Sequence, residues 1–270
     1  MSAIDEAASR HILITGATGG IGSATARLLA QPGTRLSYVA RDPARLQDLV
    51  HETWKADSAV GVPADLADLD GIAGIVAKAE ARHGPVDILV NNAAVDGFGH
   101  LEDMPPTEIR RVFDINLLAP ILLTRAVVPQ MLARGSGHIV TIGSIFGSIG
   151  FAGFAAYSSG KFALRGFSEA LRRELGHSGI AVTYVAPRYT KTGLNSPAVD
   201  RMAVATKMAR DEPVDVARQI VAAIESRRAE LIIGRAERVF VRLNALWPKL
   251  VDRGLAKTTK KIRDLGKPAA

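Results

Sequence analysis

Short apolar runs rich in β-branched residues alternate along the chain with segments in which apolar residues recur at helical spacing. The runs predict seven strands, at residues 11–15, 35–40, 59–63, 86–91, 138–142, 180–186 and 230–233. The helical segments predict six helices, at residues 20–30, 43–55, 68–83, 105–134, 156–177 and 213–227. Such alternation is typical of a parallel sheet with helices on both faces. The pattern therefore predicts a doubly wound α/β fold in a single domain.

Two predicted connections, residues 93–104 and 187–212, are much longer than the others. Long loops inside a compact α/β domain commonly carry function. Ligands of such sheets bind at the carboxyl ends of the strands, where both loops emerge. We therefore expect these loops to form the walls of a substrate site.

The composition, 47% apolar and 23% charged over 270 residues, is that of an ordinary globular protein. The chain contains no cysteine, which excludes disulfides, thiol nucleophiles and zinc–thiolate sites, and we expect no metal. The first ten residues lack the basic and apolar regions of a secretory signal. The most apolar stretch, residues 117–123, is much shorter than the roughly 20 residues that span a bilayer, and we interpret it as buried helix. These features indicate a cytoplasmic protein.

The net charge of +7 is concentrated at the C-terminal end of the chain. Residues 1–234 contain 24 basic and 24 acidic side chains, whereas residues 235–270 contain ten basic and three acidic ones. A neutral body without aromatic residues interleaved among basic ones makes nucleic acid an unexpected partner. The distribution predicts a catalytic domain at residues 1–234 and a basic helical extension at residues 235–270.

A glycine-rich turn follows the first predicted strand and opens the first predicted helix. Glycines let backbone N–H groups approach a pyrophosphate closely, and the helix N-terminus favours an anion. The alternative is a tight turn that only packs the helix against the strand. No Gly-Lys-Ser/Thr follows, which excludes a nucleoside-triphosphate P-loop. The residues expected at a dinucleotide are Gly16, Thr18, Gly20, Ile21 and Gly22.

The end of the second predicted strand, where dinucleotide folds recognise the adenosine ribose, holds Ala40 followed by Arg41. An acidic residue at the last strand position would repel a 2′-phosphate, whereas a guanidinium can bind that phosphate through two hydrogen bonds. This favours NADP(H) as the cofactor. NAD(H) is the alternative, if Arg41 is merely solvated or Asp42 turns inward to the ribose.

Tyr157 and Lys161 are four residues apart on a predicted helix and project from one face. Ser144 follows the fifth predicted strand and precedes Tyr157 by thirteen residues. An ammonium near a phenol favours the phenolate, so we expect Lys161 to lower the pKa of Tyr157 and to make it an acid or base near neutrality. Alone, the pair could be a surface pair; with the serine and the glycine turn it indicates catalysis.

The combination of these residues resembles the short-chain dehydrogenase/reductase family, in its compact branch. The resemblance extends from about residue 10 to residue 234, and its joint spacing is highly specific. It implies a Rossmann-like fold. The motifs that carry it are Thr15-Gly16-x-x-x-Gly20-x-Gly22, Asp65-Leu66, Asn91-Asn92-Ala93-Ala94, Asn116, Ser144 and Tyr157-x-x-x-Lys161.

The resemblance also implies roles for individual residues. Tyr157 would protonate a carbonyl oxygen to which Ser144 is hydrogen-bonded. Lys161 would bind the nicotinamide ribose, and Asn116 would hold a water in a proton relay. The remaining cofactor contacts implied are Asp65 and Leu66 near the adenine, Asn92 and Ala93 at the adjoining ribose, and Pro187, Thr190 and Thr192 near the nicotinamide and phosphates.

The sequence departs from the family pattern at two positions. Ala94 replaces a glycine, which requires an allowed backbone angle there. Arg188 replaces the glycine after Pro187, where the side chain could bind an acidic substrate group or remain solvated.

Four of the fourteen aromatic residues lie within the twelve residues 146–157, just after Ser144. They are Phe146, Phe151, Phe154 and Tyr157. Together with Phe98, Met202, Val204 and Met208 they suggest a pocket for an apolar carbonyl or alcohol substrate, although packing or a subunit contact would also explain them.

The function expected is NADPH-dependent carbonyl reduction or the reverse oxidation. The alternative is a cofactor-binding regulatory or scaffold protein without turnover. The resemblance implies a homodimer or homotetramer.

Residues 235–270 predict an amphipathic helix, broken at Pro248 because proline lacks an N–H donor. On a helical wheel the basic residues cluster beside an apolar face. We expect this face to pack as a lid on the loop 187–212 or as an oligomer contact; the alternative is a basic helix on anionic lipid. The residues of the predicted apolar face are Val239, Phe240, Leu243, Leu246, Trp247 and Leu250.

Overall fold

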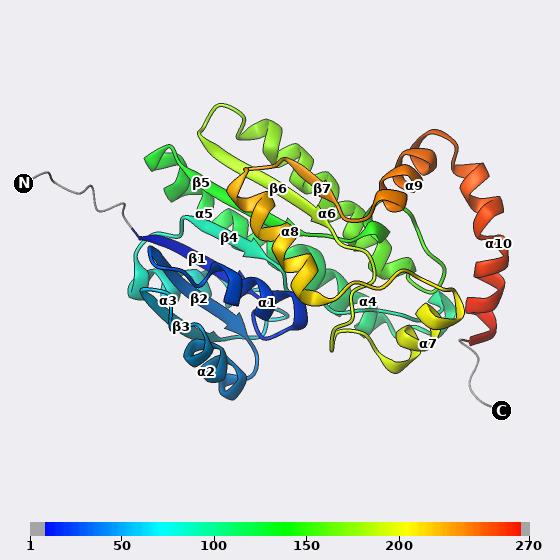
Figure 1. The fold of residues 1–270 in the computed structure, drawn as a ribbon, viewed down its shortest axis with the longest axis horizontal. Coiled ribbons are helices and arrows are strands. Elements are labelled where there is room, and N and C mark those ends of the chain that lie inside the picture. Colours follow the sequence, from blue (N-terminus) through cyan, green and yellow to red (C-terminus); the bar gives the residue numbers. More distant parts are fainter. Residues whose placement is uncertain (1–8, 266–270) are drawn as a thin grey trace, which may run out of the picture.

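The computed structural model describes residues 9–265 and contains a seven-stranded, fully parallel sheet in the order β3-β2-β1-β4-β5-β6-β7 (Figure 1). The chain crosses from one half of the sheet to the other between β3 and β4, as in Rossmann folds. Every predicted strand is present. The strands are β1 (Arg10–Thr15), β2 (Thr34–Ala40), β3 (Ser58–Pro63), β4 (Ile88–Asn91), β5 (Gly137–Ile142), β6 (Ile180–Ala186) and β7 (Glu230–Ile232).

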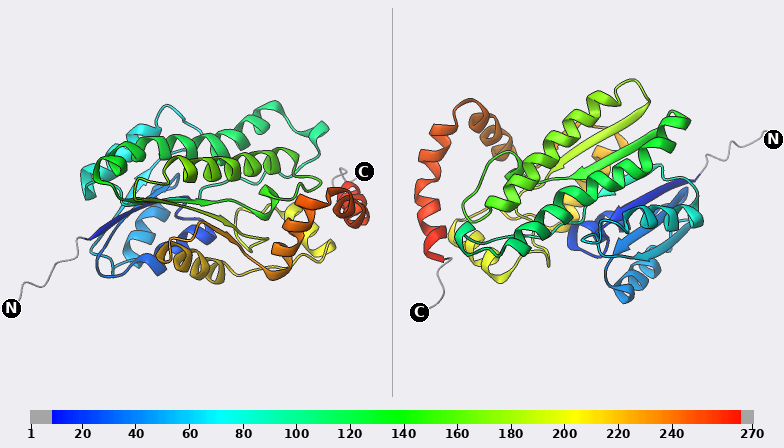
Figure 2. Two further views of the ribbon diagram at one scale, coloured as in Figure 1. Left: turned by 90° about the horizontal axis from the view of Figure 1, so that it is seen from above. Right: turned by 180° about the vertical axis from the view of Figure 1, so that it is seen from behind.

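Helices cover both faces of the sheet, which confirms the doubly wound architecture (Figure 2). One face is covered by α1 (Gly20–Leu29), α2 (Pro43–Glu52) and α8 (Pro213–Glu225), and the other by α3 (Ile72–His83), α5 (Ala119–Arg134) and α6 (Ala155–Glu174). The remaining helices are α4 (Pro106–Phe113), α7 (Pro197–Ala205), α9 (Arg235–Leu246) and α10 (Pro248–Leu265).

The core consists of two apolar layers, one on each side of the sheet. In β1, Ile12 and Ile14 belong to the layer under α1 and α8, whereas Leu13 belongs to the layer under α3 and α5. This is the period-two alternation of a strand that is buried on both faces. The two layers explain why the strands are almost continuously apolar in sequence.

The predicted helix 105–134 forms as α4 and α5, joined by one π-helical turn at Asp114–Leu118. The helical stretch Pro106–Arg134 is long and apolar enough to span a bilayer by length and composition. Its Leu123, Val127 and Met131, however, are fully buried against the sheet. We therefore describe it as a core helix of the α/β fold.

The two long predicted loops contain short helices. The loop 93–104 includes a 3₁₀ turn at Leu101–Asp103, and the loop 187–212 includes α7. Ser196 caps α7 by accepting a hydrogen bond from the Val199 N–H, and proline follows at the first helical position. The loop prediction for 187–212 was therefore incomplete, because this capping signal was not used.

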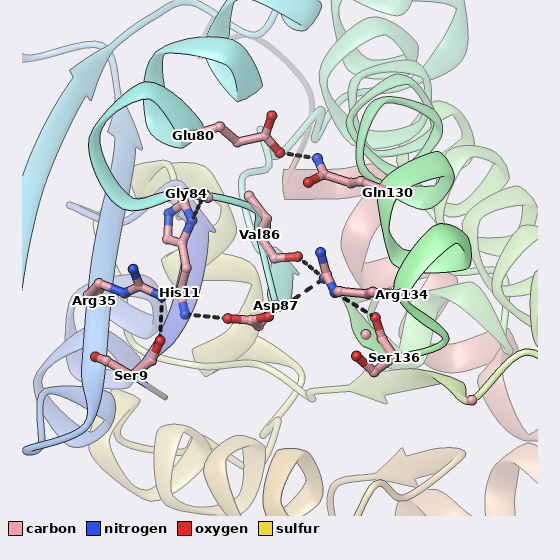
Figure 3. Close-up of polar contacts among 12 residues, drawn as sticks. Ser9, His11, Arg35, Glu80, Gly84, Val86, Asp87, Gln130, Arg134 and Ser136 are labelled. Atoms are coloured by element: carbon pink, nitrogen blue, oxygen red, sulfur yellow. Dashed lines mark hydrogen bonds and ion pairs between the residues drawn. The ribbon is translucent and has the colours of Figure 1, made fainter. Parts of the chain in front are cut away.

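A polar network joins residues at the amino-terminal ends of the strands, which is the end of the sheet away from the site (Figure 3). The Asp87 carboxylate accepts a hydrogen bond of 2.7 Å from the His11 backbone N–H and lies 3.7 Å from the Arg134 guanidinium. Arg134 also donates to the Val86 and Ser136 carbonyls, which ties the end of α5 to β4 and β5. The network fixes the strand ends far from the loops that form the site.

The C-terminal segment forms two helices, α9 and α10, that meet at Trp247–Pro248 as the proline predicted. They lie at one end of the molecule, beyond β7 and beside α7 (Figure 1). The predicted apolar face does not pack on the body as a lid, because five of its six residues are exposed, namely Val239, Phe240, Leu246, Trp247 and Leu250. An oligomer contact through this face stays a prediction. The side chains that pack inward are instead Val241 on α9 and, after the break, Val251 and Ile262 on α10. Lys267 lies outside the described residues.

Candidate active site

The glycine turn between β1 and α1 has the close backbone contacts expected of a dinucleotide site. Gly16 has a φ of +61°, in the left-handed region that favours glycine. A Cβ on Gly22 would lie 2.2 Å from the Gly16 carbonyl oxygen, so no larger residue fits there. Because Gly19 at the N-cap has no side chain, the first N–H groups of α1 face the cavity and can bind an anion.

Two guanidinium groups line the cavity at the end of β2. Arg41 follows the strand, and Arg45 lies on the first turn of α2, where its Nη2 donates a 2.6 Å hydrogen bond to the Thr18 carbonyl. Asp42 does not line the cavity. Its carboxylate instead caps α2 by accepting hydrogen bonds from the Ala44 and Arg45 N–H groups, at 2.9 and 3.3 Å. Arg45 was missed in the sequence, although an arginine one helical turn after Arg41 was a usable signal.

The segment after β4 is anchored to the glycine turn. The Thr15 hydroxyl accepts hydrogen bonds from the N–H groups of Asn92 and Ala93, at 3.0 and 3.1 Å. The Asn92 amide donates to the Thr15 and Gly16 carbonyls, at 3.0 and 3.1 Å. Ala94 has no positive φ and so replaces the family glycine without strain. This segment therefore forms a rigid wall beside the glycine turn.

Ser144, Tyr157 and Lys161 meet at the carboxyl end of β5, where all three line the same cavity. Lys161 is buried, and its Nζ donates a 3.1 Å hydrogen bond to the Ile142 carbonyl. The same Nζ lies 5.6 Å from the centre of the Tyr157 ring. The Ser144 hydroxyl accepts a 3.1 Å hydrogen bond from the Phe146 N–H, which fixes the turn that follows β5.

Loss of solvent dominates the protonation equilibria of this group. Burial raises the pKa of Tyr157 to about 12, with hydrogen bonding to Ser144 acting in the opposite direction and the charge of Asp96 adding to the rise. Burial lowers the pKa of Lys161 to about 8. The expectation that Lys161 lowers the pKa of Tyr157 is therefore not met in the chain alone, because burial dominates and Lys161 is not among the groups that shift this pKa. A tyrosine in this state is protonated at neutral pH and can act as an acid.

Asn116 does not line the cavity; the π-helical turn places it behind the site, fully buried. Its Oδ1 accepts a 2.8 Å hydrogen bond from the Val95 N–H, and its Nδ2 donates a 2.9 Å bond to the Val95 carbonyl. Both ends of the amide thus hold the loop after β4 in place. Its role in a water relay stays a prediction.

The loop after β6 forms a further wall of the cavity, and its Pro187 carbonyl accepts a 3.0 Å hydrogen bond from the Ile145 N–H, next to Ser144. Pro187, Thr190 and Thr192 all line the cavity, and a Cβ on Gly20 would lie 2.6 Å from the Thr192 Cγ2. Arg188 has no positive φ, so its replacement of a family glycine does not strain the backbone. Its guanidinium binds both carboxylate oxygens of Asp211, at 2.7 and 2.8 Å, and donates a 3.2 Å bond to Glu237 on α9. Arg188 is therefore engaged within the protein, neither solvated nor free for a substrate acid.

Aromatic and thioether side chains form the wall beside Tyr157. Phe146 packs on Phe151 with ring centres 4.7 Å apart and on Phe154 at 5.0 Å. Of the predicted apolar residues, Phe146, Phe154, Met202 and Met208 line the cavity. Phe98 and Phe151 pack behind this wall, and Val204 is exposed on the far side of α7.

Sixteen of the seventeen predicted site residues line one cavity of about 530 Å³ between these elements. The seventeenth is Asn116. Outside the prediction, Arg45 and Glu237 also line the cavity, and Asp211 holds Arg188 from behind it. Tyr184 supports the site without lining it: its buried ring lies against Gly143 and Gly147, and its hydroxyl donates to the Ser144 carbonyl at 3.3 Å. No sequence signal identified Tyr184, because it reads as an ordinary strand residue.

A family model described as short chain dehydrogenase matches residues 10–203. Dehydrogenase/reductase SDR family member 7B of Danio rerio is 33% identical over 268 residues, covering 93% of this chain and 85% of that protein. Ketoacyl reductase HetN of Nostoc is 32% identical over 253 residues, covering 90% of this chain and 87% of that protein.

Solved structures agree with these relatives. A short-chain dehydrogenase from Streptomyces avermitilis is 32% identical, with a TM-score of 0.78 that covers 95% of this chain and 99% of the other. A metagenomic short-chain oxidoreductase in complex with NADP is 33% identical, with a TM-score of 0.70 over 84% of this chain and 97% of the other.

Proposed function

Because the chain belongs to the short-chain dehydrogenase/reductase family, we propose that it is an NADPH-dependent reductase of apolar ketones or aldehydes, which also catalyses the reverse oxidation. The observation that carries this proposal is the cavity itself. It has two guanidinium groups at one end, and Ser144, Tyr157 and Lys161 beside an apolar wall at the other. The names of similar proteins, a ketoacyl reductase and a complex with NADP, point the same way.

The residues present fit a nicotinamide dinucleotide. The glycine turn and the first turn of α1 would hold the pyrophosphate, and Asn92 and Ala93 the adjoining ribose. Asp65 and Leu66 line the cavity where the adenine would lie. Arg41 and Arg45 would bind a 2′-phosphate, since Asp42 is engaged as a helix cap. This arrangement supports NADP(H) over NAD(H).

The bound cofactor supplies a hydride to the carbonyl carbon. The chain's own part is to orient and protonate the carbonyl oxygen: the hydroxyls of Ser144 and Tyr157 donate hydrogen bonds to it, and Tyr157 releases its proton as negative charge develops there. The neutral phenol that burial maintains is the form this step requires. Lys161 would hold the nicotinamide ribose and would favour the transient phenolate by its charge.

An apolar substrate is supported by the wall of Phe146, Phe154, Met202 and Met208. A carbonyl carried on an alkyl or aryl chain would bury that chain here and place its oxygen at Ser144 and Tyr157. We further propose a homodimer or homotetramer that packs through α5 and α6, because Leu118 at the start of α5 and Phe162 on α6 are exposed.

The test is a panel of ketones and aldehydes of increasing chain length, assayed by loss of NADPH absorbance. We expect kcat/KM to rise with chain length, and calorimetry to show tight NADPH binding. NADPH binding without turnover of any carbonyl would instead support a regulatory or scaffold protein.

A further inference from the structure

α9 and α10 meet at the end of the molecule beyond β7 (Figure 1). On α9 and at this junction several large apolar side chains are exposed. Each of these side chains is more than half exposed, and they occupy a short stretch of chain around the Trp247–Pro248 turn. Large apolar side chains in a contiguous exposed patch are uncommon on soluble surfaces and indicate an interaction site. We call this surface the tail patch; it consists of Val239, Phe240, Leu246, Trp247 and Leu250.

A row of basic side chains continues from the tail patch along α10. Lys249, Arg253, Lys257 and Lys260 are spaced four, four and three residues apart, so they share one face of the helix, and all four are exposed. The opposite face of α10 carries Val251, Leu255 and Ile262, which pack on the body. We call the four basic residues the tail ridge.

The surroundings of the patch are also basic. Arg235, Arg238 and Arg242 are exposed on α9. Among the side chains that the structure describes, Glu237 is engaged by Arg188, Glu102 pairs with Arg263 near the end of α10, and Asp252 is exposed at the margin of the tail ridge. The positive charge on the outer face of α9 and α10 is therefore largely uncompensated.

We propose that the tail patch and the tail ridge dock this protein on an anionic lipid surface. Aromatic and leucine side chains beside lysine and arginine match the boundary between acyl chains and anionic headgroups. A second copy fits less well, because a two-fold symmetric contact through the patch would bring the same basic side chains together. A nucleic acid would leave the apolar patch unused. This proposal does not depend on the reaction proposed above.

Docking in this way would place the substrate wall near the lipid. Ile262, on the inner face of α10, packs in one cluster with Phe154, Val199 and Met202, and these three line the cavity. α10 alone thus lies between the lipid that its outer face would contact and the residues that line the cavity.

The two tryptophans of the chain provide matched probes, because Trp54 at the end of α2 and Trp247 in the tail patch are both exposed. Trp54→Phe leaves only Trp247, and Trp247→Phe leaves only Trp54. We expect vesicles of phosphatidylcholine and phosphatidylglycerol to shift the emission of Trp247 to shorter wavelength and to leave that of Trp54 unchanged. Phosphatidylcholine vesicles alone should have a much smaller effect.

Charge variants separate the ridge from the overall charge. The triple variant Lys249→Glu, Arg253→Glu and Lys257→Glu should weaken co-sedimentation with the anionic vesicles by at least about tenfold. The control, Lys55→Glu, Lys78→Glu and Arg82→Glu, makes the same change in net charge at exposed positions on or just after α2 and α3 and should retain most of the binding. Turnover of a water-soluble ketone should be the same in both variants.

Three results would overturn the proposal. Equal losses in the two triple variants would show that binding follows only net charge. Equal emission shifts for both single-tryptophan proteins would show that the tail patch does not enter the lipid. Emission of Trp247 that changes on dilution without vesicles, together with a lower oligomer mass for Leu250→Ser, would assign the patch to a second copy of this chain.

Discussion

Lys161 illustrates how individual residues at this site combine function with an energetic penalty. Its ammonium is buried, at 2% exposure, and donates to the Ile142 carbonyl. Burial lowers its pKa from 10.5 to about 8, which means that the folded protein holds this proton less tightly than the unfolded chain does. The cost of burying this ammonium is best explained by the role of Lys161 beside Tyr157.

Lys161→Met should therefore stabilise the protein at neutral pH while lowering kcat/KM by at least about tenfold. The unfolded chain binds more protons than the folded one between pH 8 and 10.5, so wild-type stability rises with pH in that window. The advantage of the methionine variant should shrink accordingly. Urea denaturation at about pH 7 and about pH 9.5 measures this, with Lys78→Met on the surface as control. A lower free energy of unfolding for Lys161→Met than for the wild type at neutral pH would contradict a cost of burying the Lys161 ammonium.

Arg41→Ala and Arg45→Ala should each reduce the preference for NADPH. A charge-assisted contact worth about 1.5–3 kcal/mol corresponds to roughly a ten- to hundredfold ratio of dissociation constants in the wild type. Fluorescence titration with both coenzymes measures the ratio, and Arg27→Ala, which removes an exposed ion pair with Glu52, is the control. Asp42→Ser keeps a capping side chain and should leave NADH binding unchanged. Weaker NADH binding in that variant would mean that Asp42 recognises the ribose.

Between elements, Arg188 connects the loop after β6 to the C-terminal helices. Its partners are Asp211 at the end of that loop and Glu237 on α9, and all three side chains are partly buried. The cofactor loop and the C-terminal segment are thus held by one guanidinium. An arginine in place of a family glycine here serves as a connection between elements.

Arg188→Ala should lower the free energy of unfolding by about 1–2 kcal/mol, because the carboxylates of Asp211 and Glu237 lose their partner. This value lies between those for exposed and for buried ion pairs. It should also raise the KM for NADPH more than it lowers kcat, since the loop lines the cofactor cavity. Arg218→Ala, which breaks an exposed pair with Asp215 on α8, is the matched control. If both variants behave alike in denaturation and kinetics, Arg188 does not hold the loop.

Buried imidazoles in the helix and strand packing make the fold sensitive to acid. Burial lowers the pKa of His83 on α3 and of His138 on β5 to about 4, from an ordinary value of 6.5. The unfolded chain therefore takes up these protons first, and stability should fall as pH decreases from 6.5 toward 4. Urea denaturation midpoints should fall less steeply with decreasing pH in the double variant His83→Asn and His138→Asn than in the wild type. The exposed His51→Asn is the control, and an unchanged slope in the double variant would assign the decline to other groups.

For the molecule as a whole, the sequence was enough to predict the sheet and most of the site. Strands buried on both faces leave apolar runs such as Ile12–Ile14, and spaced motifs such as Tyr157 and Lys161 identify the cavity. Contacts that depend on three-dimensional packing were not predictable in the same way. The Arg188 contacts join residues far apart in the chain, and the inward face of α10 depends on how the helix turns at Pro248. The rise in the pKa of Tyr157 depends on burial that only the folded chain reveals.

The central claim is that Tyr157 supplies the proton when this chain reduces a carbonyl with NADPH. The direct measurement is kcat for the best ketone of the panel, with NADPH affinity, in the wild type and in Tyr157→Phe, which removes the hydroxyl and keeps the ring. We predict that kcat falls by at least about a hundredfold, the usual contribution of general acid catalysis, while NADPH affinity is nearly unchanged. Wild-type turnover in Tyr157→Phe would contradict the account.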